Sequence, residues 1–508
     1  MENWPQELYD NVASFYLRGI FQNNPAFLTL ATVCRKFQNS VESYTFQSLL
    51  IDSTESKLND LERILTPRRR KYLQSLAIKM VLPPYPIECI TEFETDQDRR
   101  ANNEIVTAGL RRVFCLIASL YGQDEDIIPM LHLTIIAPAS SSDKGVRPFL
   151  PKASADDRIR IRPDLNWQRY QFSLIDLSSD LSDFPDLPCV QKFSICDGRR
   201  NWNPRVAMLL STKMSKASMI NWFLDRREDD WGRYYGMERK YRDDLVKSIM
   251  SADFPRSTTR FCYHIAIPWA HNRQKFLPQF VASGENDPVS SALRHLTRNC
   301  TNIHIVGPVH STFFDPLTGI RDGDQQCWKD VRVFKTTLFM RSPEGKWYFK
   351  LKDGVTEDSS FSIPLGDQLP PGYGDTKEEL EKCEEYYYRH MILPKIRDEP
   401  ERVIPDSIEL NALFAVFARA CCRLPVLKEA SIEVVCSGIE TWQYEVGCLA
   451  PGTPFPKGKK MHKHDTNSWR VYFLLHQWKP SEATIEELKM IGRSRTGCDP
   501  VFLWGVGD

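Results

Sequence analysis

Apolar residues near the amino terminus recur at helical spacing. Pro5 is suited to the first position of a helix that extends to about Leu17, because proline loses no needed hydrogen-bond donor there. Leu8, Val12 and Phe15 follow at i, i+4 and i+7 and form one apolar stripe. The pattern therefore predicts an amphipathic helix at the start of the chain.

Two further helical segments are expected before residue 50. Pro25 opens the second, whose apolar face runs from Phe27 to Val33. The third carries the apolar positions Phe37, Val41, Tyr44 and Phe46. Three short helices bury little surface by themselves, so residues 1–50 are expected to pack on the rest of the chain or on a partner.

A different pattern fills residues 51–508: apolar, two spacers, apolar, one spacer, apolar. Its copies begin at Leu73, Met130, Val190, Cys262, Cys300 and, in a degenerate form, Leu427. Residues 105–117 and 410–418 have helical spacing and precede the second and the last copy. Strands that alternate with helices in this way predict an irregular, leucine-rich-repeat-like α/β solenoid with one strand in each unit.

The copies are unevenly spaced, which leaves a second interpretation open. Successive copies lie 57, 60, 72, 38 and 127 residues apart, whereas regular leucine-rich repeats are about 20–29 residues long. The alternative is an ordinary α/β sheet whose strands carry apolar residues with a period of two. Long insertions are expected at about residues 139–155, 311–400 and 451–465, with a hairpin over 337–351 and a charged helix over 377–390.

Composition narrows the class of protein. The 508 residues contain 66 Lys and Arg and 66 Asp and Glu, so the formal net charge is zero and no nucleic-acid partner is expected. The amino terminus lacks the basic start and apolar stretch of a secretory signal, and no clean apolar run is long enough to span a membrane. The 14 cysteines are irregularly spaced and are expected to be reduced thiols. The cytoplasm or nucleus is the expected compartment.

Signatures of catalysis and of cofactor binding are scarce. The chain has no GxSxG, HExxH or GxGxxG motif, so no catalytic residue, metal ligand or cofactor is assigned. His462 and His464 are a weak metal signal on a loop. The basic runs 68–71 and 457–463 could contact an acidic partner or phosphate, but they are expected to serve solubility. Trp222 and its aromatic neighbours could stack on bases or a peptide, and their helical spacing favours packing at least as much.

The first fifty residues also carry a recognisable motif. Trp4-Pro5-x-Glu7-Leu8 is followed by Val12, and Leu28-x-Leu30-Ala31-x-Val33 leads into Cys34-Arg35-Lys36-Phe37. This pattern resembles an F-box, the adaptor-binding module of SCF-type ubiquitin ligases. The exit from Glu42 to Leu49, the run 73–85 and the run 410–432 are similar to uncharacterised F-box proteins of filamentous fungi.

The resemblance implies a three-helix F-box over residues 1–50, followed by the repeat-like α/β domain of residues 51–508. It implies a non-catalytic substrate receptor that binds a Skp-type adaptor and, through it, a cullin scaffold, and that captures an unidentified protein target. The residues implied in adaptor binding, or in the core just beneath it, are Pro5, Leu8, Val12, Leu28, Val33 and Phe37.

Two other functions remain open from the residues. One is a ligase-independent interaction scaffold in which the helices are only a structural cap. The other is an enzyme with a site assembled from scattered residues near His264, His304 and His310. An exposed apolar patch on the N-terminal helices distinguishes adaptor docking from a cap.

Overall fold

The computed structural model describes most of the chain. The described residues are 4–19, 29–86, 89, 94–122, 130–144, 169–170, 173–198, 200–224, 235–265, 279–282, 284–315, 328–352, 402–436, 442–456 and 466–505. Residues 20–28, which include Leu28 and the expected start of the second helix at Pro25, lie outside them, as do the expected charged helix 377–390 and the histidines of residues 462–464.

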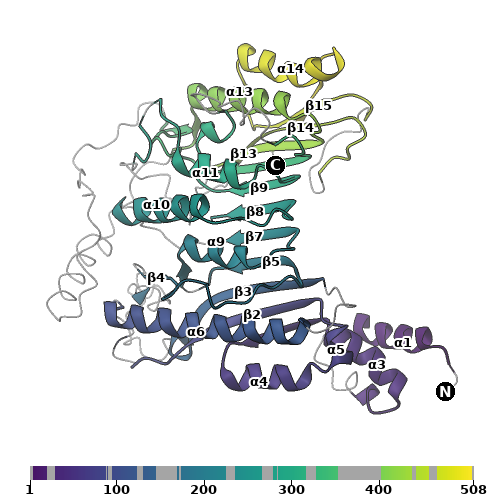
Figure 1. Ribbon diagram of the computed structural model, residues 1–508. Coiled ribbons are helices and arrows are strands. Elements are labelled where there is room, and N and C mark those ends of the chain that lie inside the picture. The colour runs from purple at the N-terminus through teal and green to yellow at the C-terminus, as the bar shows by residue number, and fades with distance from the viewer. Residues whose placement is uncertain are drawn as a thin grey trace, which may run out of the picture.

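A twelve-stranded sheet dominates the structure, and its strands lie side by side in the order in which they occur in the sequence (Figure 1). They are β1 (Ser48–Asp52), β2 (Ser75–Leu82), β3 (Leu131–Ser140), β5 (Val190–Cys196), β7 (Met219–Phe223), β8 (Arg260–His264), β9 (Asn302–Val306), β10 (Val333–Leu338), β13 (Glu429–Cys436), β14 (Trp442–Leu449), β15 (Arg470–Leu474) and β16 (Val501–Gly505). From β1 to β13 every neighbouring pair is parallel. Mixed α/β architecture is thus confirmed.

Helices make most of the connections between these strands. They are α1 (Gln6–Gly19), α3 (Arg35–Thr45), α4 (Glu55–Ile64), α5 (Pro67–Arg70), α6 (Asp96–Tyr121), α9 (Pro204–Thr212), α10 (Tyr235–Ser251), α11 (Pro288–Leu296), α13 (Ser407–Arg423) and α14 (Glu482–Thr496), with the 3-10 turns η2 (Ser141–Lys144) and η4 (Ser311–Phe313). Two small sheets pair β4 (Leu174–Ile175) with β6 (Asn201–Trp202) and β11 (Phe349–Lys350) with β12 (Ile404–Pro405).

Several helices begin where the local sequence requires it. The Asp287 side chain accepts hydrogen bonds from the amides of Val289 and Ser290, and a proline occupies the first helical position of α11. Thr95 and Asp98 form a reciprocal capping box at the start of α6. These caps satisfy amide groups that a helix leaves without an internal partner.

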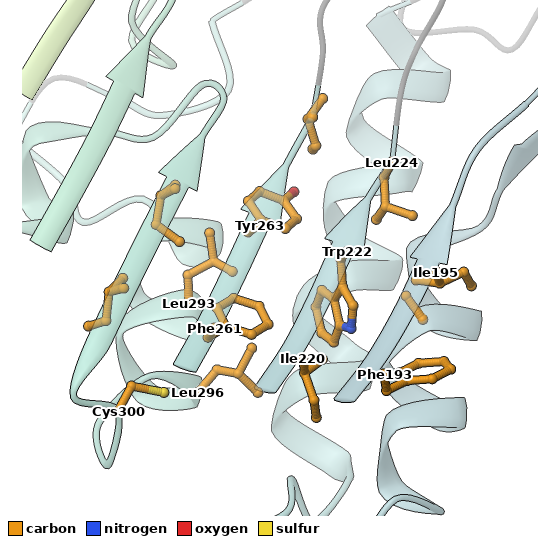
Figure 2. Close-up of a cluster of buried hydrophobic side chains, with 14 of the residues drawn as sticks. Phe193, Ile195, Ile220, Trp222, Leu224, Phe261, Tyr263, Leu293, Leu296 and Cys300 are labelled. Carbon is orange, nitrogen blue, oxygen red and sulfur yellow. The ribbon is translucent and has the colours of Figure 1, made fainter. Parts of the chain in front are cut away.

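One face of the sheet forms the core. A right-handed crossover between successive parallel strands places its helix on the same face each time when the strands follow in order. Figure 2 shows Ile220, Trp222, Phe261 and Tyr263 on this face, beside Leu293 of α11. Their neighbours along each strand point to the other face, which we call the open face.

The expected strands are largely confirmed. The copies beginning at Leu73, Val190, Cys300 and Leu427 coincide with β2, β5, β9 and β13, and α6 and α13 occupy the two predicted helical stretches. In the second copy Leu133 and Ile135 are buried in β3, but Met130 is exposed.

Three expectations are wrong in detail. Strand β8 starts before the predicted copy, so Phe261 and Tyr263 are buried while Cys262 lies on the open face. Trp222 packs as predicted, but from strand β7 and not from a helix. The hairpin over 337–351 is reduced to a turn with one antiparallel bridge between Arg341 and Trp347, because β10 pairs within the main sheet.

The carboxyl end of the sheet departs from the parallel pattern. Strand β14 runs antiparallel to β13 and β15. There Tyr472 lies across the open face and donates a hydrogen bond to Glu445 Oε1 at 2.8 Å, and the Phe455 ring packs on it with centroids 5.1 Å apart. Leu449 and Leu503 complete this cluster, so the chain itself covers the open face at this end.

Gly447 makes room for the Tyr472 ring, because a Cβ atom added there would lie 2.2 Å from Cζ of the ring. We expect Gly447→Ala to lower the free energy of unfolding by about 1–3 kcal/mol through overpacking, measured by urea denaturation. In a Tyr472→Ala background the same substitution should add almost no further loss. An equal loss in both backgrounds would contradict the assigned contact.

Candidate functional site

Two helices of the N-terminal unit pack through one face of α1. The Gln6 side chain donates hydrogen bonds to Ser40 Oγ at 2.8 Å and to the carbonyl oxygen of Lys36 at 3.1 Å. One turn later the Tyr9 ring meets Phe37 edge-on with centroids 4.7 Å apart. Ala13 continues this face, which is therefore the internal face of the unit.

Several large apolar side chains of this unit remain in contact with solvent. Leu8 is 43% exposed, Trp4 is 44% exposed and Val33 is 61% exposed. Val33 follows a turn whose Leu30 and Ala31 pack against the core of α1 and α3. Exposed apolar side chains of this size are candidates for contact with another protein.

The predicted site residues divide into two groups. Pro5, Leu8 and Val33 are exposed and Val12 is half-buried. Phe37 is buried against Tyr9, so it supports the unit from beneath and cannot itself reach a partner. The stripe predicted from Leu8 and Val12 is therefore not the packing face of α1, because Tyr9 and Ala13 take that role.

A buried carboxylate connects this unit to the sheet domain. Glu42 of α3 is 5% exposed, and it pairs with Arg68 and, at 2.8 Å, with Arg69 of α5. The Arg69 guanidinium also lies 4.8 Å from the centre of the Phe46 ring, and the Arg70 guanidinium donates to the carbonyl oxygen of Leu120 at 2.7 Å. The basic run 68–71, expected to serve solubility, instead joins α3 to α6.

The ionisation of Glu42 follows from these contacts. Burial alone raises the pKa of Glu42, but the hydrogen bond and charge of Arg69, followed by the charge of Arg68, outweigh burial and hold that pKa below its ordinary value of 4.5. The carboxylate is therefore ionised at neutral pH, and the connection between the two parts is ionic.

Polar side chains cover the middle of the open face. His132 Nε2 lies 3.1 Å from Ser194 Oγ, and the Asn221 amide donates to the same hydroxyl at 3.0 Å. Further along, Cys262 Sγ lies 3.8 Å from His304 Nδ1. These side chains form a row across strands β3 to β9.

The Cys262–His304 contact is not an activated nucleophile. Burial raises the pKa of Cys262 to about 11, so its thiol stays protonated at neutral pH. Burial, followed by the charges of Lys335 and His264, lowers the pKa of His304. The pair is a neutral contact between strands.

The third histidine of the proposed scattered site lies elsewhere. His310 is buried after β9, where it accepts a hydrogen bond from the Thr312 amide and pairs with Glu344 at 2.8 Å. His264 lies on the open face beside Val306. The described part of the chain contains no group of three or more His, Cys, Asp or Glu side chains placed to hold a metal ion.

In comparison with known proteins, no family model, no curated protein and no solved structure matches the chain. Among the described helices, none combines the length and the apolar character that crossing a lipid bilayer requires.

Glu42→Gln tests the ionic connection. Removing the charge leaves two arginines without their carboxylate, so we expect a loss of about 1–2 kcal/mol and roughly 5- to 30-fold faster amide exchange in α1 and α3. Hydrogen exchange followed by mass spectrometry measures this at neutral pH. Glu62→Gln removes an exposed partner of Arg112 and should cost less than about 0.5 kcal/mol.

The same connection predicts a pH dependence. The folded pKa of Glu42 is depressed, so its contribution to stability is complete above 4.5 and disappears as the pH falls through the lower folded value. Exchange in α1 and α3 of the native protein should therefore approach that of Glu42→Gln at low pH. A constant difference between them across this range would refute the ionic role.

Proposed function

We propose that this protein is a non-catalytic substrate-receptor subunit of an SCF-type cullin–RING ubiquitin ligase. The N-terminal helices act as an F-box and bind a Skp-type adaptor, which brings the cullin scaffold. The α/β body, an irregular leucine-rich-repeat-like solenoid in this proposal, captures the protein target.

The observation that carries the proposal is the exposure of Leu8 and Val33 on a helical unit whose own core is already formed by Tyr9, Phe37 and Val41. Covering a large apolar side chain contributes about 1.5–3 kcal/mol. Leu8 and Val33 are 43% and 61% exposed, so an adaptor that covers them would gain roughly half of that value for each, without rearranging the core of the unit. A structural cap does not require Leu8 and Val33 to be exposed, whereas adaptor docking does.

The connection through Glu42 supports the same role. A substrate receptor must hold its target at a defined position relative to the adaptor, because ubiquitin transfer depends on the geometry of the assembly. The ion pairs from Glu42 to Arg68 and Arg69 restrain the helical unit against the body. The open face and the edges of the sheet then offer a long platform for the target.

Leu8→Asp combined with Val33→Asp tests the adaptor surface. Each substitution removes apolar contact area and places a charge that the interface would have to bury, so we expect at least about a 100-fold loss of affinity for the Skp-type adaptor. Binding of the purified full chain to the adaptor is measured by isothermal titration calorimetry. Both side chains are exposed, so the melting temperature should stay unchanged.

Met130→Asp combined with Ile408→Asp is the matched control, because these apolar residues are 63% and 74% exposed outside the helical unit. It should bind the adaptor like the native chain. If the native chain, correctly folded, does not bind the adaptor at all, the ligase role is refuted and the ligase-independent scaffold remains. Equal affinity of the native chain and the double aspartate variant would refute the assigned surface.

A further inference from the structure

The turns that lead into five neighbouring strands lie side by side at the border of the sheet where these strands begin, which we call an edge here. Parallel strands in consecutive order all begin at the same edge, and the strands concerned are β7, β8, β9, β10 and β13. Backbone hydrogen bonds continue across the turns: the amide of Thr259 donates to Ser218 at 3.0 Å, that of Thr301 to Thr259 at 2.7 Å and that of Lys428 to Arg332 at 2.8 Å. Side chains from different turns are thereby brought close together.

Each of these turns carries an exposed cation. The five cations are Lys216, Arg256, Arg298, Arg332 and Lys428. We call them together the basic edge. The structure records no ion pair or hydrogen bond from their side chains to any residue that it describes. Neighbouring strands lie about 4.8 Å apart, so the five turns span about 19 Å. Arg332 and Lys428 directly precede their strands, whereas the other three cations lie three or four residues before theirs.

Acidic side chains in the same five turns are few. Among the described residues of these turns the carboxylates are Asp253 and Asp330, and Lys213 and Lys329 add positive charge. Lys213 pairs with Asp186 at 3.6 Å. The basic edge therefore has a clear excess of positive charge in a chain whose total charge is zero.

Positive charge also continues onto the adjoining open face. Lys192 of β5 and Arg260 of β8 both lie opposite Met219 of β7, at the start of their strands. On the open face from β2 to β10 the strands carry no carboxylate among the described residues, and the first ones met beyond them are Glu429 and Glu433 of β13.

Helix capping does not account for this arrangement. A cation favours the carboxyl end of a helix only within about the last turn. Arg298 lies two residues beyond α11, but Arg256 and Lys428 each lie five residues beyond α10 and α13. Like charges held this close repel one another, and a bound anion would relieve that repulsion.

We propose that the basic edge binds an acidic, extended segment of a protein. This rests on the proposed function only in identifying that protein as the target to be ubiquitinated; the binding itself is a property of the body. A span of about 19 Å corresponds to about six extended residues, so the segment is a short, dense run of Asp and Glu.

A fluorescein-labelled peptide with about eight consecutive Asp and Glu residues is the probe, chosen to exceed that span. Fluorescence polarisation with the full chain measures its affinity at low and at physiological salt. We expect binding that weakens as salt increases, and no binding of the peptide in which Gln and Asn replace the acids.

The variant Arg256→Gln, Arg298→Gln and Arg332→Gln should bind the acidic peptide at least about tenfold more weakly. The matched control removes three exposed, unpaired cations elsewhere, as Lys57→Gln, Lys352→Gln and Lys479→Gln. It loses the same total charge, so it should bind within about twofold of the native chain. Similar losses in both variants would show only the effect of net charge and would overturn the proposal.

Two further measurements distinguish this proposal from the alternatives. The variant Leu8→Asp with Val33→Asp should keep full peptide affinity, so loss of adaptor binding and loss of peptide binding are independent. If the native chain binds the adaptor but not the acidic peptide, the proposed role of the basic edge is refuted and the proposed function is not. Tighter binding of an oligouridylate of equal charge would replace the acidic protein segment by a single-stranded nucleic acid and would also overturn the proposal.

Discussion

Parallel pairing of strands in sequence order is the constraint on which the rest of this structure depends. Two parallel strands cannot be joined by a tight turn, so each connection must return to the starting edge, and it does so with one hand. Helices consequently collect on one face, which leaves the other face and the edges of the sheet for other uses. The uneven spacing of the strand pattern has two causes: the connections differ in length, and the intervals of 72 and 127 residues each contain a further strand of this sheet, β7 and β10, that the pattern does not mark.

The first strand and the last strands of this sheet have different surroundings. At the carboxyl end the direction reverses at β14, and Tyr472 and Phe455 cover the open face. At the amino end α3 leads into β1, and the charged contact from Glu42 to Arg68 and Arg69 joins the helical unit to the body. The chain itself thus covers the open face at the last strands of the sheet. The helical unit before the first strand instead presents Leu8 and Val33 to solvent.

Local pattern predicted part of the secondary structure, because alternation and capping act over a few residues, but it did not indicate β1, β7 or β14 to β16. It placed β2, β5, β9 and α6 correctly. It failed at β8, where aromatic Phe261 and Tyr263 form the buried positions and Ile265 follows the strand. For the candidate site, sequence identified the exposed Leu8 and Val33. It did not reveal that Tyr9 and Ala13 form the internal face.

Contacts between distant residues explain the remaining errors. The sequence run 68–71 suggested a solvated cluster, but its acidic partner Glu42 lies 26 residues before Arg68. Likewise the fully buried Arg200 pairs with Glu94, which lies 106 residues earlier, and neither position is marked by a motif.

The basic edge shows the opposite situation, in which charges that are isolated in the sequence lie in neighbouring turns of the structure. Its cations are single residues separated in sequence by about forty positions or more, with only Arg298 and Arg332 somewhat closer, and no charge run marks them. A sheet built in sequence order converts each such interval into one strand spacing of about 4.8 Å. Sequence clustering of charge is therefore a poor guide to surface potential in this architecture, where the turns that precede successive strands bring distant charges to one border of the sheet.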